Sequence, residues 1–378
     1  MKIVVLGGAG DMGSRAVEVL AATPDVQEVT IADRDVDGAT RLADRIGGQG
    51  ARVRVRSVDA SDHSSLVRAL SGHDVAASAL GPFYRFEVGM VRAAIDAGVD
   101  YTSICDEWNP LEQVLDELDG PARDAGRTIV CGLGTSPGIT NVGIRYYADR
   151  MDRVERVRVT VYQPLDAGGG EAVLRHMLFI MSGDVAVWRH GRRQLVPACG
   201  ESQEVELPGA GLLRVWNMGH GEPVTVPRYI QGLKEVGFFM GYGRGSWPLV
   251  TAARYHLFAG RRRANAAVRL LSPLERLTKD REPSPGAVRM DVWGEEGGAA
   301  VHRMACGVGT MREATALSLV VGTLMLARRE GLTRRGGAFA PEACLDPERF
   351  LTDLAALGIV AYEDLEMRRP VIVAPADA

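Results

Sequence analysis

A glycine-rich turn directly after the first apolar segment constrains the fold of this 378-residue chain more than any other feature. Residues 2–6 read Lys-Ile-Val-Val-Leu, which is the composition of a buried parallel strand. The turn reads Gly8-Ala9-Gly10-Asp11-Met12-Gly13, and a helical pattern continues from Ser14 to about Ala22. A second apolar strand, 26–32, is followed at once by Asp33. This combination predicts a βαβ unit of the Rossmann type that binds a nicotinamide dinucleotide.

Five residues of the turn have an expected role in binding the dinucleotide. Gly8 allows the tight turn, Gly10 lets backbone N–H groups reach the pyrophosphate, and Gly13 lets the helix pack closely on the sheet. Asp11 and Met12 stand at the helix N-terminus, whose partial positive charge favours phosphate groups. We therefore expect all five residues to contact the cofactor.

The end of the second strand bears on the choice between NAD and NADP. The Asp33 carboxylate can accept hydrogen bonds from both hydroxyls of the adenosine ribose, and it would repel a 2′-phosphate. This favours NAD. Arg34 leaves NADP possible, because a guanidinium at this place can hold a 2′-phosphate.

Further cofactor contacts are expected where later strands end, because ligands bind at the carboxyl ends of parallel strands. Asp59 follows the third strand, 53–58, where side chains approach the adenine. Ala79, Leu80 and Gly81 end the fourth strand, 75–80, where the backbone passes the nicotinamide ribose.

Strands and helices alternate along the first 131 residues. Further helices are expected at 39–46, 64–70, 88–97 and 111–125, and further strands at 101–104 and 128–131. This alternation predicts an α/β fold with a Rossmann-type doubly wound parallel sheet. We assign it to a dinucleotide-binding domain of residues 1–135.

The pattern changes after Gly132 to the alternation of apolar and polar residues that is typical of antiparallel strands. Such strands are expected at 154–162, 212–216, 224–229, 287–293 and 300–306, and a helix with a capping box at 310–329. We predict a second, α+β domain for substrate binding and dimerisation at 136–340. The segment 341–378 should pack back on the first domain through a helical stripe made of Phe350, Leu351, Leu354 and Leu357.

Composition excludes several classes of function. The net charge of −4 gives no reason to expect a nucleic-acid or membrane partner, and the longest apolar run, 314–327, is too short to span a bilayer. The 5 cysteines form no C-x-x-C pair, which indicates reduced thiols in a cytoplasmic protein. No spacing of His, Cys and acidic residues is typical of a metal site.

Several short motifs follow the opening turn in order along the chain. They are Gly81-Pro82-Phe83, the segments 97–101 (Ala-Gly-Val-Asp-Tyr) and 103–107 (Ser-Ile-Cys-Asp-Glu), 134–141 (Gly-Thr-Ser-Pro-Gly-Ile-Thr-Asn), 219–228, and Ala340-Pro341-Glu342. With these motifs the chain resembles the saccharopine dehydrogenase family in its broad sense, which includes lysine 6-dehydrogenase-like enzymes. The resemblance implies hydride transfer at a carbon that bears nitrogen, a Rossmann domain completed by the C-terminal helix, and a homodimer. The lysine and histidine pair of the lysine-forming saccharopine enzymes is not found here, which puts saccharopine itself in doubt as the substrate.

Hydride transfer of this kind needs an acid/base group for nitrogen and an anchor for a substrate carboxylate. Cys105 and Asp106 follow the fifth strand, where they should lie at the nicotinamide end; a packed thiol and a helix cap are the alternatives. Ser136 opens a helix at the domain crossover and should contact the nicotinamide or the substrate. The remaining candidates stand around a predicted strand of the second domain: His220 as acid/base, Glu222 beside it, and Arg228 as the bidentate carboxylate anchor.

The leading hypothesis is an NAD(P)-dependent oxidoreductase that acts on the CH–NH carbon of an amino acid or imine. One alternative is a lyase or synthase that uses bound NAD as a transient hydride store. The other is a dinucleotide-binding protein without turnover.

Overall fold

The computed structural model describes residues 1–373 apart from 49, 165–169, 244–245, 256, 259–262, 264–265 and 270–283. The chain forms two compact units, Met1–Val142 with Arg312–Leu357, and Gly143–Met311 with Gly358–Ala378. Residues 312–340, which we expected in the second domain, thus belong to the first unit, and the end of the chain belongs to the second. Each unit is made of two separate stretches of sequence, which a segment-by-segment division of the chain does not reveal.

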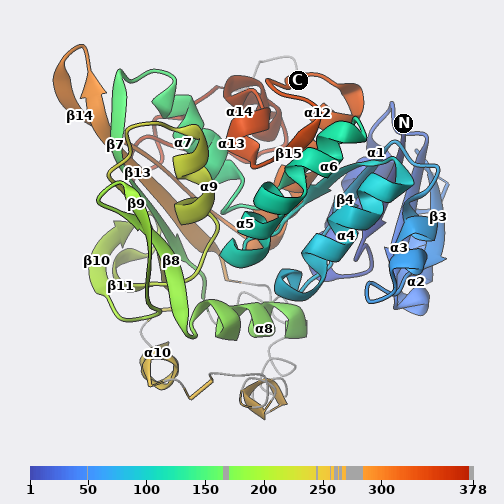
Figure 1. The fold of residues 1–378 in the computed structure, drawn as a ribbon, viewed down its shortest axis with the longest axis horizontal. Coiled ribbons are helices and arrows are strands. Elements are labelled where there is room, and N and C mark those ends of the chain that lie inside the picture. Colours follow the sequence, from blue (N-terminus) through green and yellow to red (C-terminus); the bar gives the residue numbers. More distant parts are fainter. Residues whose placement is uncertain are drawn as a thin grey trace. The chain divides into compact units, whose positions relative to one another are not determined.

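A sheet of seven parallel strands forms the centre of the first unit (Figure 1), in the order β15-β6-β5-β4-β1-β2-β3. The strands are β1 (Lys2–Leu6), β2 (Glu28–Asp33), β3 (Arg52–Ser57), β4 (Val75–Ser78), β5 (Asp100–Ser103), β6 (Thr128–Cys131) and β15 (Gly337–Phe339). The predicted doubly wound sheet is confirmed. Because the strand order reverses between β1 and β4, the crevice that binds ligands in such sheets lies at the carboxyl ends of these two strands.

The helices of the first unit cover both faces of this sheet. They are α1 (Asp11–Ala22), α2 (Val36–Ile46), α3 (His63–Leu70), α4 (Phe83–Ala97), α5 (Trp108–Glu117), α6 (Asp119–Asp124), α12 (Met311–Arg328), α13 (Pro341–Cys344) and α14 (Pro347–Ala356). Helix α4 begins five residues before the predicted start, with Pro82 as its N-cap. On the other face, Thr323 of α12 hydrogen bonds to Thr102 of β5 at 2.7 Å.

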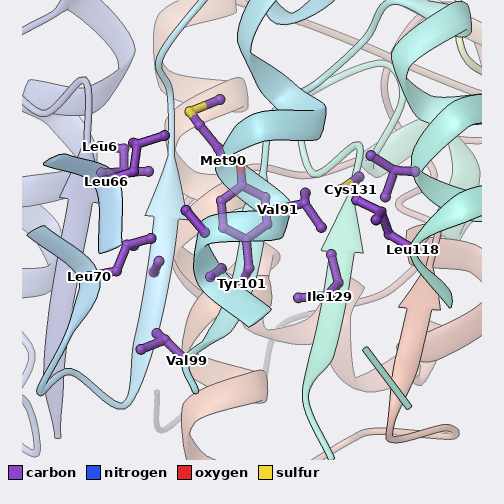
Figure 2. Close-up of a cluster of buried hydrophobic side chains, with 14 of the residues drawn as sticks. Leu6, Leu66, Leu70, Met90, Val91, Val99, Tyr101, Leu118, Ile129 and Cys131 are labelled. Carbon is purple, nitrogen blue, oxygen red and sulfur yellow. The ribbon is translucent and has the colours of Figure 1, made fainter. Parts of the chain in front are cut away.

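A buried apolar cluster joins α3, α4 and α5 to one face of the sheet (Figure 2). Leu6 of β1, Leu66 of α3 and Ile129 of β6 are 0–1% exposed. The ring of Tyr101 lies in the middle of this cluster, beside Val91 of α4. The core therefore reaches up to the carboxyl ends of β4, β5 and β6, from which the loops of the cofactor site emerge.

The second unit contains a mixed eight-stranded sheet in the order β10-β11-β12-β7-β13-β14, with β8 paired to β12 and β9 to β8. Its strands are β7 (Arg153–Tyr162), β8 (Asp184–Arg189), β9 (Arg192–Pro197), β10 (Ser202–Leu207), β11 (Gly211–Asn217), β12 (Glu235–Gly241), β13 (Gly286–Glu296) and β14 (Ala299–Gly309). The strands expected at 287–293 and 300–306 are found as β13 and β14, which pair antiparallel with each other.

Helices α7 (Ile139–Ala148), α8 (Gly170–Ile180), α9 (Glu222–Tyr229) and α10 (Trp247–Arg254) accompany this sheet. The strand expected at 224–229 is wrong, because these residues belong to α9. The alternating β-branched residues favoured a strand, but Pro223 and Pro227 disfavour one, since proline cannot donate to a ladder. Pro223 is well placed in the first helical turn, where no N–H partner is needed.

The predicted C-terminal helix is α14, which belongs to the first unit as expected. Phe350, Leu351 and Leu354 are buried, but Leu357 is 42% exposed and is not part of the buried stripe. From Gly358 onward the chain belongs to the second unit, where Tyr362 exchanges two backbone hydrogen bonds with Cys306. Among the described residues, the helices are all too short or too polar to cross a membrane.

Candidate functional site

The glycine-rich turn between β1 and α1 is shaped by contacts that exclude side chains. Gly7 has a φ of 73°, and its carbonyl oxygen accepts a hydrogen bond from Gly10 N at 3.1 Å. A Cβ atom on Gly13 would lie 2.1 Å from this same oxygen, and one on Gly8 would lie 3.0 Å from Val5 O. The left-handed residue of the turn is thus Gly7, one position before the Gly8 to which we assigned the tight turn. Gly13 allows the close packing predicted for it.

Asp33 of β2 is held against this turn by two backbone donors. One carboxylate oxygen accepts from Ala9 N at 3.0 Å and the other from Asp35 N at 3.0 Å. Each oxygen keeps capacity for a further hydrogen bond. The half-buried carboxylate is therefore oriented for the ribose hydroxyls, while the neighbouring Arg34 is exposed.

Asp11 and Met12 form the first turn of α1. The exposed Asp11 would weaken the attraction of this helix N-terminus for phosphate. Its charge is balanced by Arg312 of α12, whose guanidinium donates to the Asp11 side chain at 3.0 Å and to Ser14 Oγ at 3.2 Å. A cation thus stands at the place where the pyrophosphate is expected.

The loops after β1 and β4 meet, as the topology requires. A Cβ atom on Gly7 would lie 2.9 Å from the Leu80 Cα atom. Ala79, Leu80 and Gly81 are all half-buried at this point. Asp59, after β3, is exposed and accepts from Ser61 Oγ and N, which lowers the pKa of its carboxyl. The structure therefore brings together, within one unit, the residues predicted to bind the dinucleotide from its pyrophosphate to its nicotinamide ribose.

The loop between β5 and α5 contains Cys105 and Asp106. Cys105 is 0% exposed, and burial raises the pKa of its thiol well above the usual range. A neutral, packed thiol is a poor proton carrier, which leaves Asp106, half-buried in the same loop, as the acid/base candidate here. The N-cap position of α5 is occupied by Glu107 and not by Asp106.

Ser136 lies in a tight loop after β6. Gly134 N donates to Pro137 O at 2.8 Å, and Gly138 has a φ of 130°. Thr135 Oγ1 lies 2.9 Å from Thr315 Oγ1 of α12, which fixes the start of this loop. Ser136 itself is half-buried, ahead of α7 as predicted.

In the second unit, His220 and Glu222 form a buried pair. Nδ1 of His220 lies 2.6 Å from Glu222 Oε2, and the two residues are 4% and 0% exposed. Toward an ionised Glu222, which only accepts, Nδ1 donates, and Nε2 of a neutral His220 then holds the lone pair. The imidazole is stacked on Phe238 of β12 at 3.8 Å between ring centroids. This arrangement orients Nε2 as a base and stabilises the imidazolium that protonation would form.

Arg228 lies in the last turn of α9, on the same helix as Glu222. Its exposed side chain donates from Nε to Val224 O at 3.3 Å. His176 of α8 also lies close, with its ring centroid 6.4 Å from that of His220. The structure thus groups three of the predicted catalytic residues in one unit and Cys105, Asp106 and Ser136 in the other.

Sequence reasoning included Glu107, in the segment 103–107, but missed a second buried carboxyl group of the first unit, Glu87. Glu87 and Glu107 are both 0% exposed. Glu87 follows Phe83 by one turn and precedes Val91 by another, on the buried face of α4. A carboxylate on an apolar helical stripe is a recognisable signal, but the helix expected from residue 88 did not include it.

Comparisons with known proteins concern the N-terminal domain and the fold. Residues 3–130 match the family described as saccharopine dehydrogenase NADP binding domain. A trans-acting enoyl reductase of Mycobacterium tuberculosis is 26% identical over 142 residues, 37% of this chain and 34% of that protein. Carboxyaminopropylagmatine dehydrogenase of Synechocystis is 28% identical over 154 residues, 39% of this chain and 37% of that protein. The matched stretches therefore span less than half the length of the curated relatives.

Among solved structures, apo saccharopine dehydrogenase (L-Glu forming) of Saccharomyces cerevisiae has a similar fold. It aligns with a TM-score of 0.68 at 15% identity and covers 96% of this chain and 99% of its own. At this identity the likeness concerns the fold, and it extends through both units. Residues 3–130 match the saccharopine dehydrogenase NADP binding domain, in a chain whose fold is similar to that of yeast saccharopine dehydrogenase.

Proposed function

We propose that the protein is an NAD(P)-dependent oxidoreductase that transfers a hydride to or from the CH–NH carbon of an amino acid or imine. The buried Glu222–His220 pair carries this proposal, in a chain whose first unit is a dinucleotide-binding domain. Oxidation of an amine to an imine releases a hydride, which the nicotinamide takes up, and one proton from nitrogen. His220 Nε2 accepts that proton, and Glu222 stabilises the resulting imidazolium. Imine reduction is the reverse.

A second candidate reaction is the reduction of a carbon–carbon double bond. The matches to trans-acting enoyl reductases favour it, and the same His220 could then protonate the carbon. The match to carboxyaminopropylagmatine dehydrogenase supports the amine reaction instead. A synthase with a transient hydride store, or a protein without turnover, would show no net change in reduced nicotinamide.

The proposal is tested by following reduced-nicotinamide absorbance with purified protein, both cofactors, and three panels: amino acids, imines formed from an amine and a carbonyl, and enoyl thioesters. Turnover confined to the first two panels supports the proposal. Turnover confined to enoyl thioesters, or none in any panel while NADH still binds, contradicts it. The homodimer and the cytoplasmic location stay predictions, the first of which light scattering would check.

Replacing Asp33 by alanine should narrow the preference for NAD over NADP. The variant loses two charge-assisted hydrogen bonds to the ribose, which should cost NAD about tenfold or more in affinity. It also loses the repulsion of a 2′-phosphate, which should raise the affinity for NADP. Titration with NADH and NADPH measures both dissociation constants. Asp37→Ala, which removes an exposed acid of α2, is the matched control. A wild-type protein that prefers NADPH would show that Arg34 decides the choice.

Replacing Arg228 by alanine should raise KM for a carboxylate substrate about 10- to 100-fold with a smaller change in kcat. A charge-assisted hydrogen bond contributes roughly 1.5–3 kcal/mol, and a carboxylate held equally in ground and transition states affects KM. Arg228→Lys should recover only part of the loss, because lysine lacks the planar fork. Arg214→Ala on β11, exposed and paired with Glu204, serves as control. An unchanged KM would place the anchor elsewhere.

A further inference from the structure

Glu87 is a fully buried carboxyl group at the carboxyl end of the first sheet, and the proposed mechanism does not use it. It is 0% exposed on the face of α4 that packs on β5 and β6. A buried carboxyl without hydrogen-bond partners would strongly destabilise the folded protein. Its contacts therefore indicate what it does.

Three side chains donate hydrogen bonds to this carboxyl. Tyr101 OH donates to Oε2 at 3.0 Å, and Ser103 Oγ donates to Oε1. The Cys131 thiol is the third donor. Tyr101 and Ser103 belong to β5 and Cys131 ends β6, so one carboxyl links α4 to the ends of two adjacent strands.

Two loops at the predicted nicotinamide end are hydrogen bonded to Ser103. Its carbonyl oxygen accepts from Gly132 N at 2.9 Å and from Leu133 N at 2.7 Å, at the start of the loop that leads to Ser136. Its Oγ accepts from Cys105 N at 3.5 Å, in the loop that contains Asp106. A change at the Glu87 carboxyl therefore reaches both loops through a single residue.

A second buried carboxyl stands next to this network. Glu107, the N-cap of α5, accepts from Tyr84 N at the start of α4 and is 0% exposed. Glu87 thus faces Tyr101 of β5, Cys131 of β6 and the acidic Glu107, and none of these is a cation. Burial first, and then the Glu107 charge, raise the pKa of Glu87 to about 7, against the three hydrogen bonds that lower it.

We propose that Glu87 is a positioning residue, whose ionised carboxylate holds the β5–α5 and β6–α7 loops in the arrangement that receives the nicotinamide. The carboxylate accepts from all three donors at once. A protonated carboxyl must itself donate, so at least one of the three contacts has to change. The inference rests on the proposed function in one respect, because it requires that these loops face a nicotinamide ring.

This role predicts a pH dependence of cofactor binding with a definite sign. Above about pH 7 the carboxylate form holds both loops, and below it the neutral form predominates. NADH affinity should therefore fall as the pH drops through about 7. ADP-ribose lacks the nicotinamide and uses the glycine turn and Asp33. Its affinity should therefore not depend on the protonation of Glu87.

Binding of NADH and of ADP-ribose to the intact protein is measured between about pH 6 and 8 by fluorescence and calorimetry. Glu87→Gln should weaken NADH binding about tenfold at pH 8, as expected for one weakened hydrogen bond to a charged group. It should also remove the pH dependence and leave ADP-ribose binding within about twofold. Ser103→Ala, which removes the mediating hydroxyl, should reproduce the loss if the first variant does not fold. Glu117→Gln, the same change on an exposed site of α5, is the control.

Equal losses of affinity for NADH and for ADP-ribose in the Glu87→Gln variant would overturn the proposal, because they would indicate a general structural role. Unchanged NADH binding with an unchanged pH profile would overturn it as well. Neither readout requires turnover. A chain that lacks oxidoreductase activity but shows the selective NADH loss would thus contradict the proposed function and still support the role of Glu87.

Discussion

Replacement of His220 by asparagine is expected to lower kcat by about 100- to 10,000-fold, the usual contribution of a positioned general acid/base. The buried imidazole is oriented by Glu222 and stacked on Phe238, so that a smaller amide can fill part of its place but cannot take up a proton. The effect should be confined to turnover, because cofactor binding belongs to the first unit. Steady-state kinetics with a substrate from the panels above, together with NADH titration, separate the two quantities.

Glu222→Gln should also lower kcat, but by a smaller factor than His220→Asn. The substitution keeps the size of the side chain and a hydrogen bond, but it removes the charge that stabilises the imidazolium; we expect a loss of about 10- to 100-fold in kcat. His190→Asn is the matched control, since His190 is exposed and has a φ of 52°, a conformation that asparagine tolerates. A His220→Asn variant with the wild-type kcat would remove the acid/base assignment from this pair.

Replacement of Gly13 by alanine should abolish measurable cofactor binding and destabilise the first unit. The added methyl group would lie 2.1 Å from the Gly7 carbonyl oxygen, which is backbone and cannot move aside without opening the turn. Overpacking of this kind costs typically about 1–3 kcal/mol of folding free energy, and the shift of α1 also displaces the N–H groups that face the pyrophosphate. Thermal unfolding and NADH titration measure the two effects.

Gly89 on α4 offers a matched control for Gly13. It is an exposed helical glycine, and a Cβ atom there would meet nothing within 4 Å. Gly89→Ala should therefore leave NADH binding unchanged and raise stability by up to about 1 kcal/mol, the difference in helix propensity between the two residues. If Gly13→Ala binds NADH as well as this control does, the turn is not the phosphate site.

Local patterns predicted the parts of the molecule that depend on neighbours in sequence. The turn at 8–13 and Asp33 interact within one βαβ unit, so their spacing alone indicated their contacts. The strand expected at 224–229 is wrong because its apolar alternation fits two structures, and the pair of prolines, Pro223 and Pro227, argues against a strand, since proline cannot donate to a ladder. Leu357 was wrongly included in the buried stripe of α14 because the helix ends one residue before it.

The remaining features depend on contacts between distant segments. Strand β15 consists of three residues that pair with β6, about 200 positions earlier, and nothing in Gly337-Ala338-Phe339 alone distinguishes it from a loop. Arg312 donates a hydrogen bond to the Asp11 side chain, and the two residues are 301 positions apart in the sequence. Glu87 acts through Ser103, which only the folded sheet brings to it.

The interrupted course of the chain has a consequence for how the protein is made. The first unit breaks off at Val142 and is completed only by residues 312–357, which supply α12, β15 and α14. A ribosome therefore delivers every residue of β6 long before the strand that pairs with its outer edge. Until β15 arrives, that edge has unpaired N–H and C=O groups, and the face of the sheet that α12 covers stays exposed. The first unit therefore cannot complete its fold until nearly the whole second unit has been synthesised. During this period a chaperone that binds an open sheet edge would have its largest effect on folding.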